Sequence, residues 1–301
     1  MCSYHVRRWP VRSLLVMAAL VVTAGAVGAA DQDPPLIEAV KRQDTEAVNR
    51  LLASGADPNV RQSDGATALH WAVHREDTEI VTSLIEAGAD VDAVNRLGAS
   101  ALFLAAQGGN ATMLLRLLES GADPNLALPL GETPIMTAAR SGTAQGVRHL
   151  IQAGADINRS ERSRGQTALM WAAAQGHHDV VQVLIDADAD IEARSTVRPR
   201  LMYADATNGG AFDQGIVENL GGYSALLFAA RQGDTAIADL LLTAGADVDG
   251  QAGNGATPLV VATHSGHGAL ARLLLERGAD PDAIDAGYNG LHAAVLRGDL
   301  D

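Results

Sequence analysis

Aromatic residues are scarce in this chain, since Phe, Trp and Tyr together make up 3% of its 301 residues. A globular domain of this length normally fills its core with more large aromatic side chains. A two-layer stack of short helices, built on Ala, Leu, Val and Ile, does not need them. The shortage therefore argues against two globular domains and favours one layered helical domain.

Cysteine is almost absent too, because Cys2 is the only one. It lies in an N-terminal segment that has the parts of an export signal, with Arg7, Arg8 and Arg12 before an apolar stretch at 14–26 and small residues up to position 30. We expect residues 1–30 to be a cleaved signal peptide and the protein to be periplasmic or secreted. An uncleaved membrane anchor is the alternative, although 14–30 is short for crossing a bilayer.

A chain cleaved in this way has no cysteine, and this excludes disulfides, thiol nucleophiles and Cys-ligated metals. Lysine is equally rare: Lys41 is the only lysine among 22 basic residues, and with the high alanine content this is typical of a GC-rich bacterial genome. Removing residues 1–30 takes three arginines and no acid, which leaves 19 basic and 36 acidic residues, a net charge of −17. Such acidity argues against nucleic acid or an anionic membrane as the main partner.

The sequence also lacks a nucleophile elbow, a phosphate-binding loop and a dinucleotide fingerprint. We therefore expect no catalytic activity and no cofactor within this segment. The histidines do not form a metal-binding pattern either, since no carboxylate completes an H-E-x-x-H motif around His70 and His74. Trp71 and Trp171 occupy matching positions, and we interpret them as packing residues.

What the chain has in abundance is a repeated triplet, Gly-Ala-Asp. It begins at Gly55, Gly88, Gly121 and Gly154, each 33 residues after the last, and again at Gly245 and Gly278. A degenerate copy, Asp188-Ala189-Asp190, follows the fourth triplet by 34 residues. A fixed period of this length indicates stacked copies of one supersecondary unit.

Each unit opens with a glycine suited to a tight turn, followed two residues later by Thr or Ser, which suits a helix N-cap. A short apolar helix then ends at another glycine in most units, at Gly109, Gly142, Gly176, Gly233 and Gly266. A second helix with apolar residues at helical spacing runs to the next triplet. Neither helix is long enough to be stable alone, so the units must stack.

The pattern G-x-T-P/A-L-x-x-A-A-x-x-G, a second helix and G-A-D-x-N resembles the ankyrin repeat. Thr67-Ala68-Leu69-His70 and Gly121-Ala122-Asp123-Pro124-Asn125 carry the resemblance. It implies an all-α solenoid of stacked helix-turn-helix pairs with projecting β-turns, which binds other proteins and has no catalytic activity. The array spans 31–301, with units at approximately 34–61, 62–94, 95–127, 128–161, 162–194, 219–251 and 252–284 and an incomplete one at 285–301.

The ends of the first helices carry the candidate binding residues. The two residues before each closing glycine, or its equivalent, contain no acid in any of the eight units. The resemblance implies that they line a concave groove, which would then be neutral to basic and could take an acidic or phosphate-bearing protein segment. The alternative is that cations simply favour helix C-termini. The candidates are Arg42, His74, Arg75, Arg140, Arg231, His264 and Arg297.

An insertion at 195–218 separates the fifth and sixth units. A loop of this length in a compact array is usually functional or disordered. Its apolar residues favour a partly ordered flap that packs on the turn edge or on a ligand, with Arg198, Tyr203 and the adjacent Tyr223 as candidate contacts.

Because the last unit stops within its second helix, we expect a longer protein. The predicted function is an exported, non-catalytic scaffold that binds a protein through its groove and turn tips. Two alternatives stay open: the recruiting part of an exported enzyme or electron-transfer protein, whose catalytic domain lies beyond Asp301, or an effector acting inside another cell.

Overall fold

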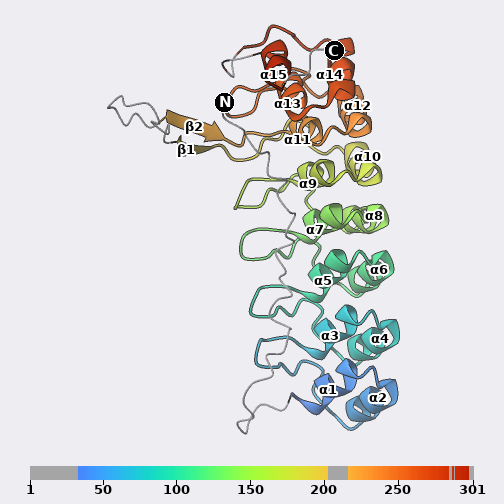
Figure 1. Cartoon of the computed structure of the whole chain (residues 1–301). Coiled ribbons are helices and arrows are strands. Elements are labelled where there is room, and N and C mark those ends of the chain that lie inside the picture. The colour runs from blue at the N-terminus through green and yellow to red at the C-terminus, as the bar shows by residue number, and fades with distance from the viewer. Residues whose placement is uncertain (1–32, 203–215, 285–286, 288, 298–301) are drawn as a thin grey trace. The chain divides into compact units, whose positions relative to one another are not determined.

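The computed structural model describes residues 33–202, 216–284, 287 and 289–297. The predicted signal peptide at 1–30, Tyr203 and the last four residues lie outside the described part. From Pro34 onward the chain forms one unit of paired antiparallel helices stacked one after another (Figure 1). In the part that is described, no helix is long and apolar enough to cross a membrane. The fold class predicted from the repeat is confirmed.

Each pair has a first and a second helix. The first helices are α1 (Pro35–Lys41), α3 (Ala68–His74), α5 (Ala101–Gly108), α7 (Pro134–Ser141), α9 (Ala168–Gln175), α11 (Ala225–Gln232), α13 (Pro258–Ser265) and α15 (Gly290–Arg297). The second helices are α2 (Thr45–Ala53), α4 (Thr78–Glu86), α6 (Ala111–Glu119), α8 (Ala144–Gln152), α10 (His178–Asp186), α12 (Thr235–Thr243) and α14 (Gly268–Glu276).

The turn residues position these helices as the sequence predicts. Ser100, Thr167, Ser224 and Thr257 cap first helices through their hydroxyl groups. The closing glycines adopt left-handed conformations, for example φ 81° at Gly142. Thr133 also stands at an N-cap, but its buried hydroxyl has no hydrogen-bond partner in the described part of the chain.

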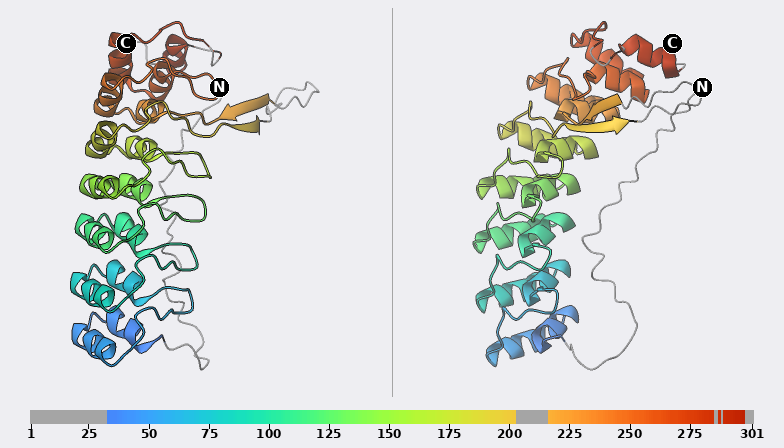
Figure 2. Two further views of the ribbon diagram at one scale, coloured as in Figure 1. Left: turned by 180° about the vertical axis from the view of Figure 1, so that it is seen from behind. Right: turned by 90° about the vertical axis from the view of Figure 1, so that its left-hand side faces the viewer.

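Figure 2 shows the helices in two rows, and the core is one apolar cluster formed by residues of both rows. Within it, alanines of the first helices such as Ala72 and Ala106 let neighbouring first helices approach closely. Leu84 and Leu117, which belong to the second helices, fill the core with larger side chains. All four are fully buried. Since helices of seven to nine residues are unstable in isolation, this shared burial is what makes each pair fold.

A first hydrogen-bond ladder joins the Gly-Ala-Asp turns. The side chain two residues after each turn aspartate accepts from the backbone N–H of the next turn aspartate. Asn59 accepts from Asp90 at 2.7 Å, and the same bond recurs along the array at 2.8–2.9 Å. Its acceptors are Asn59, Asp92, Asn125, Asn158, Glu192 and Asp249.

A second ladder joins the outer ends of the loops, which we call the tips. At each step a tip carbonyl accepts from an N–H 32 residues later: Asp64 from Arg96, Leu130 from Arg162, Arg164 from Thr196, and Gly221 from Gly253, at 2.7–2.9 Å. The corresponding step from Leu97 would end at Pro129, which has no N–H. Neighbouring loops are therefore joined at two places where both ladders run, and at Pro129, where the tip ladder has a break, by the turn ladder alone.

The insertion contains a β-hairpin that the sequence did not predict. Its strands β1 (Arg198–Met202) and β2 (Ile216–Leu220) pair antiparallel, with Arg198 opposite Leu220. It projects from the same edge as the loops (Figure 1). The strand β2 reaches two residues beyond the predicted end of the insertion at 218.

The base of the hairpin is a normal tip. Ser195 N–H bonds to the Tyr223 carbonyl and Gly222 N–H to the Ser195 carbonyl, and the next loop closes in the same way between Ala252 and Ala256. Residues 197–221 therefore stand where that loop has the single residue Asn254.

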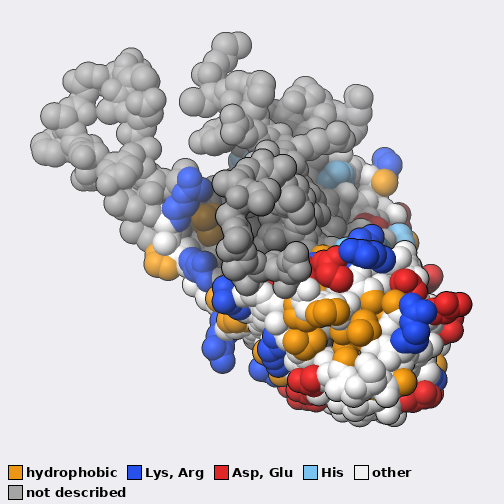
Figure 3. Space-filling model, turned by 90° about the horizontal axis from the view of Figure 1, so that it is seen from below, with side chains coloured by type: hydrophobic (Ala, Val, Ile, Leu, Met, Phe, Trp, Pro, Cys, Tyr) orange, Lys and Arg blue, Asp and Glu red, His pale blue; other side chains and the backbone are white. Residues whose placement is uncertain are grey.

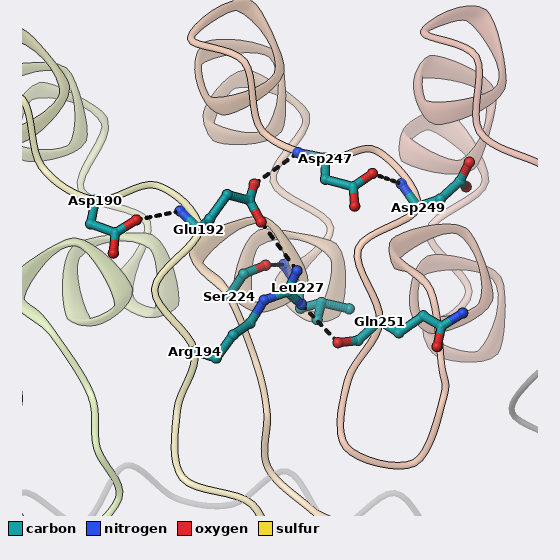
Figure 4. Close-up of polar contacts among 8 residues, drawn as sticks. All are labelled: Asp190, Glu192, Arg194, Ser224, Leu227, Asp247, Asp249 and Gln251. Carbon is teal, nitrogen blue, oxygen red and sulfur yellow. Dashed lines mark hydrogen bonds and ion pairs between the residues drawn. The ribbon is translucent and has the colours of Figure 1, made fainter.

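The turn ladder crosses the insertion without interruption. Glu192 stands where other turns have Asn or Asp, and it accepts from Asp247 N–H at 2.8 Å (Figure 4). Its other oxygen pairs with Arg194, which also donates to the Gln251 carbonyl at 2.7 Å. The units on either side of the insertion are thus joined as closely as any other two.

We predict that the array folds without the hairpin. If 197–221 are replaced by one asparagine, Thr196 still donates to Arg164, and the new residue supplies a carbonyl for Gly253. The melting temperature measured by circular dichroism should change by less than about 4 °C, since about 1 kcal/mol shifts a chain of this size by that much at most. A larger loss would mean that the hairpin packs on the array and stabilises it.

Candidate functional site

The carboxyl ends of the first helices form a row along the array, which we call the first-helix row. It contains Lys41, Arg42, His74, Arg75, Arg140, Arg231, His264 and Arg297, with uncharged residues at its other positions. First helices of adjacent units pack on one another, so each residue of the row lies beside its counterparts in the neighbouring units. The structure shows that several of these cations lie on aromatic rings.

The first such contact joins units one and two. The ammonium group of Lys41 lies 4.5 Å from the ring centre of Trp71, and it also pairs with Glu38 at 3.8 Å. The ring of His74 meets the edge of Trp71 at 6.0 Å between centroids. The indole N–H of Trp71 donates to Gln62 at 2.9 Å, which fixes the ring. Trp71 thus holds a cation from the preceding unit.

The same relation recurs between units four and five. The guanidinium of Arg140 lies 4.7 Å from the ring centre of Trp171 and pairs with Glu132 at 2.9 Å. Trp171 differs from Trp71 in one respect: its indole N–H is buried without a hydrogen-bond partner in the described part of the chain. Glu161 stands where Gln62 stands in its loop, because its N–H bonds to the Gln166 carbonyl as that of Gln62 bonds to Ala66. The Glu161 carboxylate accepts from backbone N–H groups of its own loop instead of from Trp171.

Arg231 makes the third stack, within its own unit. Its guanidinium lies 5.1 Å from the ring centre of Phe228 and 5.5 Å from that of Tyr223, and the two rings contact each other at 5.4 Å. Two predicted candidates, Arg231 and Tyr223, are therefore brought together. Tyr223 lies directly after the hairpin, so this stack is next to the insertion.

The remaining candidates are more dispersed. Arg42 is exposed and pairs with Glu38 at 3.5 Å. Arg75 and His264 are exposed at the ends of α3 and α13. Arg198 is exposed on strand β1 of the hairpin, not on a first helix. Arg297 is the last residue of α15, and its side chain lies outside the described part. Tyr203 lies outside the described part altogether.

Two histidines fix the backbone of the stacked arginines. The imidazole of His177 bonds to the carbonyl of Arg140 at 2.9 Å, and that of His267 to the carbonyl of Arg231 at 3.1 Å. Gly142 must be glycine here, because a Cβ at this position would lie 2.7 Å from the His177 ring. Among the described residues no cluster of three or more His, Cys, Asp or Glu side chains is placed to hold a metal ion.

The two histidines of α3 differ in their surroundings. His70 is 3% exposed, its Nδ1 lies 3.2 Å from the Thr67 N–H, and its Nε2 lies 2.9 Å from the Ala99 carbonyl. Burial lowers the pKa of His70. Partial burial, and then the neighbouring Arg75, lower the pKa of His74. His70 and His74 therefore carry less positive charge at neutral pH than ordinary histidines do.

Reasoning from the sequence missed the stacks and the part played by Lys41 and Glu132. A signal was present, because Lys41 precedes Trp71 and Arg140 precedes Trp171 by about one repeat. Reading it requires knowing which residues of adjacent first helices face each other.

Because folding lowers the pKa of His70 below its ordinary value of 6.5, the unfolded chain binds a proton more readily. Neutral His70 therefore contributes its full stabilisation to the folded state above about pH 6.5, and this stabilisation is lost as the pH falls below 6.5. We predict that the free energy of unfolding, measured by urea titration between about pH 7.5 and 5, falls less steeply in His70→Gln than in the parent. Equal slopes would contradict the assignment.

Comparison with known proteins bears on the whole array. The family described as ankyrin repeats (3 copies) matches residues 36–128, 112–195, 203–285 and 226–301. No curated protein matches the chain. Among solved structures, the human ASB11 ankyrin repeat domain is 24% identical with a TM-score of 0.66, covering 83% of this chain and all of that domain. The chain belongs to the ankyrin repeat family.

Proposed function

We propose that this protein is an exported, non-catalytic scaffold that binds a protein partner through its first-helix row and loop tips. Ankyrin repeats are generally protein–protein interaction scaffolds and typically non-catalytic. The observation that carries the proposal for this chain is the first-helix row itself, an acid-free series of helix ends in a chain of net charge −14.

The stacks support a role in binding acidic or phosphate-bearing segments. An arginine that lies flat on a ring keeps its edge N–H groups available for a carboxylate or a phosphate. Its contact with the ring is worth about 0.5–2 kcal/mol and holds the side chain in place. The arginine therefore loses less conformational entropy when a partner binds. The guanidinium groups of Arg140 and Arg231 lie over rings, one nitrogen of Arg140 already pairs with Glu132, and Arg75 adds a third cation on α3. A favourable interaction with the helix dipole explains the cations but not their rings.

The row is tested by charge reversal. Residues 31–301 and the variant Arg75→Glu/Arg140→Glu/Arg231→Glu are immobilised and exposed to the exported fraction of the source cells. Bound proteins are quantified by mass spectrometry. The control Arg50→Glu/Arg148→Glu/Arg272→Glu changes the same charge on the second helices.

We expect a partner that the parent and the control retain and that the row variant loses by at least about tenfold, equivalent to 1.4 kcal/mol of binding free energy. Circular dichroism must show that all three proteins are folded. A partner retained equally by the row variant would mean that the row does not bind it.

Export rests on the composition of residues 1–30, with its three arginines, apolar stretch and small residues. We predict that the mature protein begins at Ala30 or Asp31. N-terminal peptide mapping by mass spectrometry checks this, and exported protein with an intact Met1 would contradict cleavage.

A further inference from the structure

We propose that the loop tips and the base of the hairpin form a docking surface, distinct from the first-helix row, for an acidic protein segment that carries apolar side chains. We call it the tip surface and define it by Arg96, Leu97, Leu130, Arg162, Arg164 and Arg198. It rests on the proposed function, since it assumes that the array binds protein, and it specifies where and with what chemistry.

The loops contain two kinds of arginine. Arg61 and Arg194 are structural, because each guanidinium donates to a carbonyl of the next loop at 2.7 Å, Val94 for Arg61 and Gln251 for Arg194. Arg96, Arg162, Arg164 and Arg198 are exposed, and within the described part of the chain their guanidinium groups form no hydrogen bond or ion pair. Arg200, next to Arg198 on the same strand, is exposed as well.

Several described acids near these arginines are already engaged, and Asp64 beside Arg96 accepts from the Ala66 N–H at 2.9 Å. Glu161 is 3% exposed and turned inward, where it accepts from the backbone N–H groups of Ser163, Arg164 and Gln166 at 2.5–3.2 Å. This carboxylate orders the loop whose outer side carries Arg162 and Arg164. Glu192 serves the turn ladder and Glu132 pairs with Arg140.

The edge is therefore basic although the protein is acidic. Figure 3 shows Lys and Arg side chains along the left-hand edge, the side where Figure 1 draws the loops and the hairpin. Asp and Glu side chains gather mainly elsewhere in this view. In chain order, Arg96, Arg162, Arg164 and Arg198 come from successive parts of the stack, so exposed cations recur along this edge.

Apolar side chains lie among these arginines. Leu97 is 47% exposed and Leu130 is 62% exposed, at consecutive tips, and Val197 is 46% exposed at the base of the hairpin. Exposed leucine side chains make no favourable contact with the phosphate backbone of a nucleic acid. The net charge of −14 also repels a polyanion at long range. A protein segment that alternates acidic and apolar residues satisfies both kinds of side chain, so we choose it over nucleic acid.

The tips are also held in place before any partner binds. Arg162 and Thr196 donate main-chain hydrogen bonds to Leu130 and Arg164 of the preceding loops, both at 2.7 Å. A surface whose backbone is already ordered loses less conformational entropy on binding than a free loop. This favours an extended segment that lies along successive tips.

The test uses residues 31–301 and a fluorescein-labelled peptide of repeated Glu-Glu-Leu triplets, with binding measured by fluorescence anisotropy. The tip variant is Arg162→Glu/Arg164→Glu/Arg198→Glu, which leaves the main-chain bonds of the tips intact. The control Arg50→Glu/Arg148→Glu/Arg272→Glu makes the same change in charge on the second helices. The row variant Arg75→Glu/Arg140→Glu/Arg231→Glu is measured in parallel.

We expect the tip variant to bind at least about tenfold more weakly and the control variant to stay within about threefold of the parent, with the row variant losing less affinity than the tip variant. A Glu-Glu-Gly peptide should bind more weakly than Glu-Glu-Leu, and oligothymidylate more weakly than both. Equal affinities of the tip and control variants would overturn the proposal, and so would tighter binding of oligothymidylate or equal binding of the two peptides.

The outcomes separate this proposal from the function on which it rests. If only the row variant loses the peptide, the tip surface is wrong and the row remains a protein-binding site. If the array captures a protein partner but binds no acidic peptide, the scaffold function stands and the tip surface does not. If the peptide binds at the tips while the row variant captures the same partners as the parent, the first-helix row is not a binding site and the tip surface stands.

Discussion

Hydrogen bonds between neighbouring loops, each made by at least one main-chain group, determine how this array can vary. Each loop has N–H and C=O groups that no helix can satisfy, and the next loop satisfies them through the two ladders. The insertion of this chain stands where neither ladder is cut. The hairpin enters between Thr196 and Gly222, at a tip, where one residue is exchanged for a longer excursion and both flanking bonds remain.

The same constraint explains the degenerate fifth unit. Asp188 replaces the glycine of the triplet, yet it takes the left-handed conformation that the glycines take, with φ 60°. Glu192 replaces the usual Asn or Asp of the ladder, and its longer side chain still reaches the N–H of Asp247. The sequence departs from the repeat beside the insertion, but the hydrogen bonds do not.

Periodicity predicts the helix pairs and their caps because these depend on residues a few positions apart, as with Ser100 and Gly109. It does not predict the Arg140–Trp171 stack, because that contact depends on how two first helices face each other across a unit boundary. The hairpin was missed for another reason: Pro199 and the glycines of the insertion suggest irregular structure, whereas pairing between 198–202 and 216–220 is non-local. The missing cap of Thr133 has no signal in the sequence, since Thr257 precedes a proline as well and does cap its helix.

The net charge of −14 does not by itself identify the sign of a partner. Repulsion by the acidic body acts over distance and is screened beyond about 8 Å at physiological ionic strength. Hydrogen-bonded contacts between a guanidinium and a carboxylate act at about 3 Å and are screened much less. In the first-helix row Arg140 already has Glu132 and a ring, whereas Arg162 and Arg164 at the tips have neither among the described residues. The proposed acidic segment would therefore compete with Glu132 at Arg140 but with none of the described carboxylates at Arg162 and Arg164.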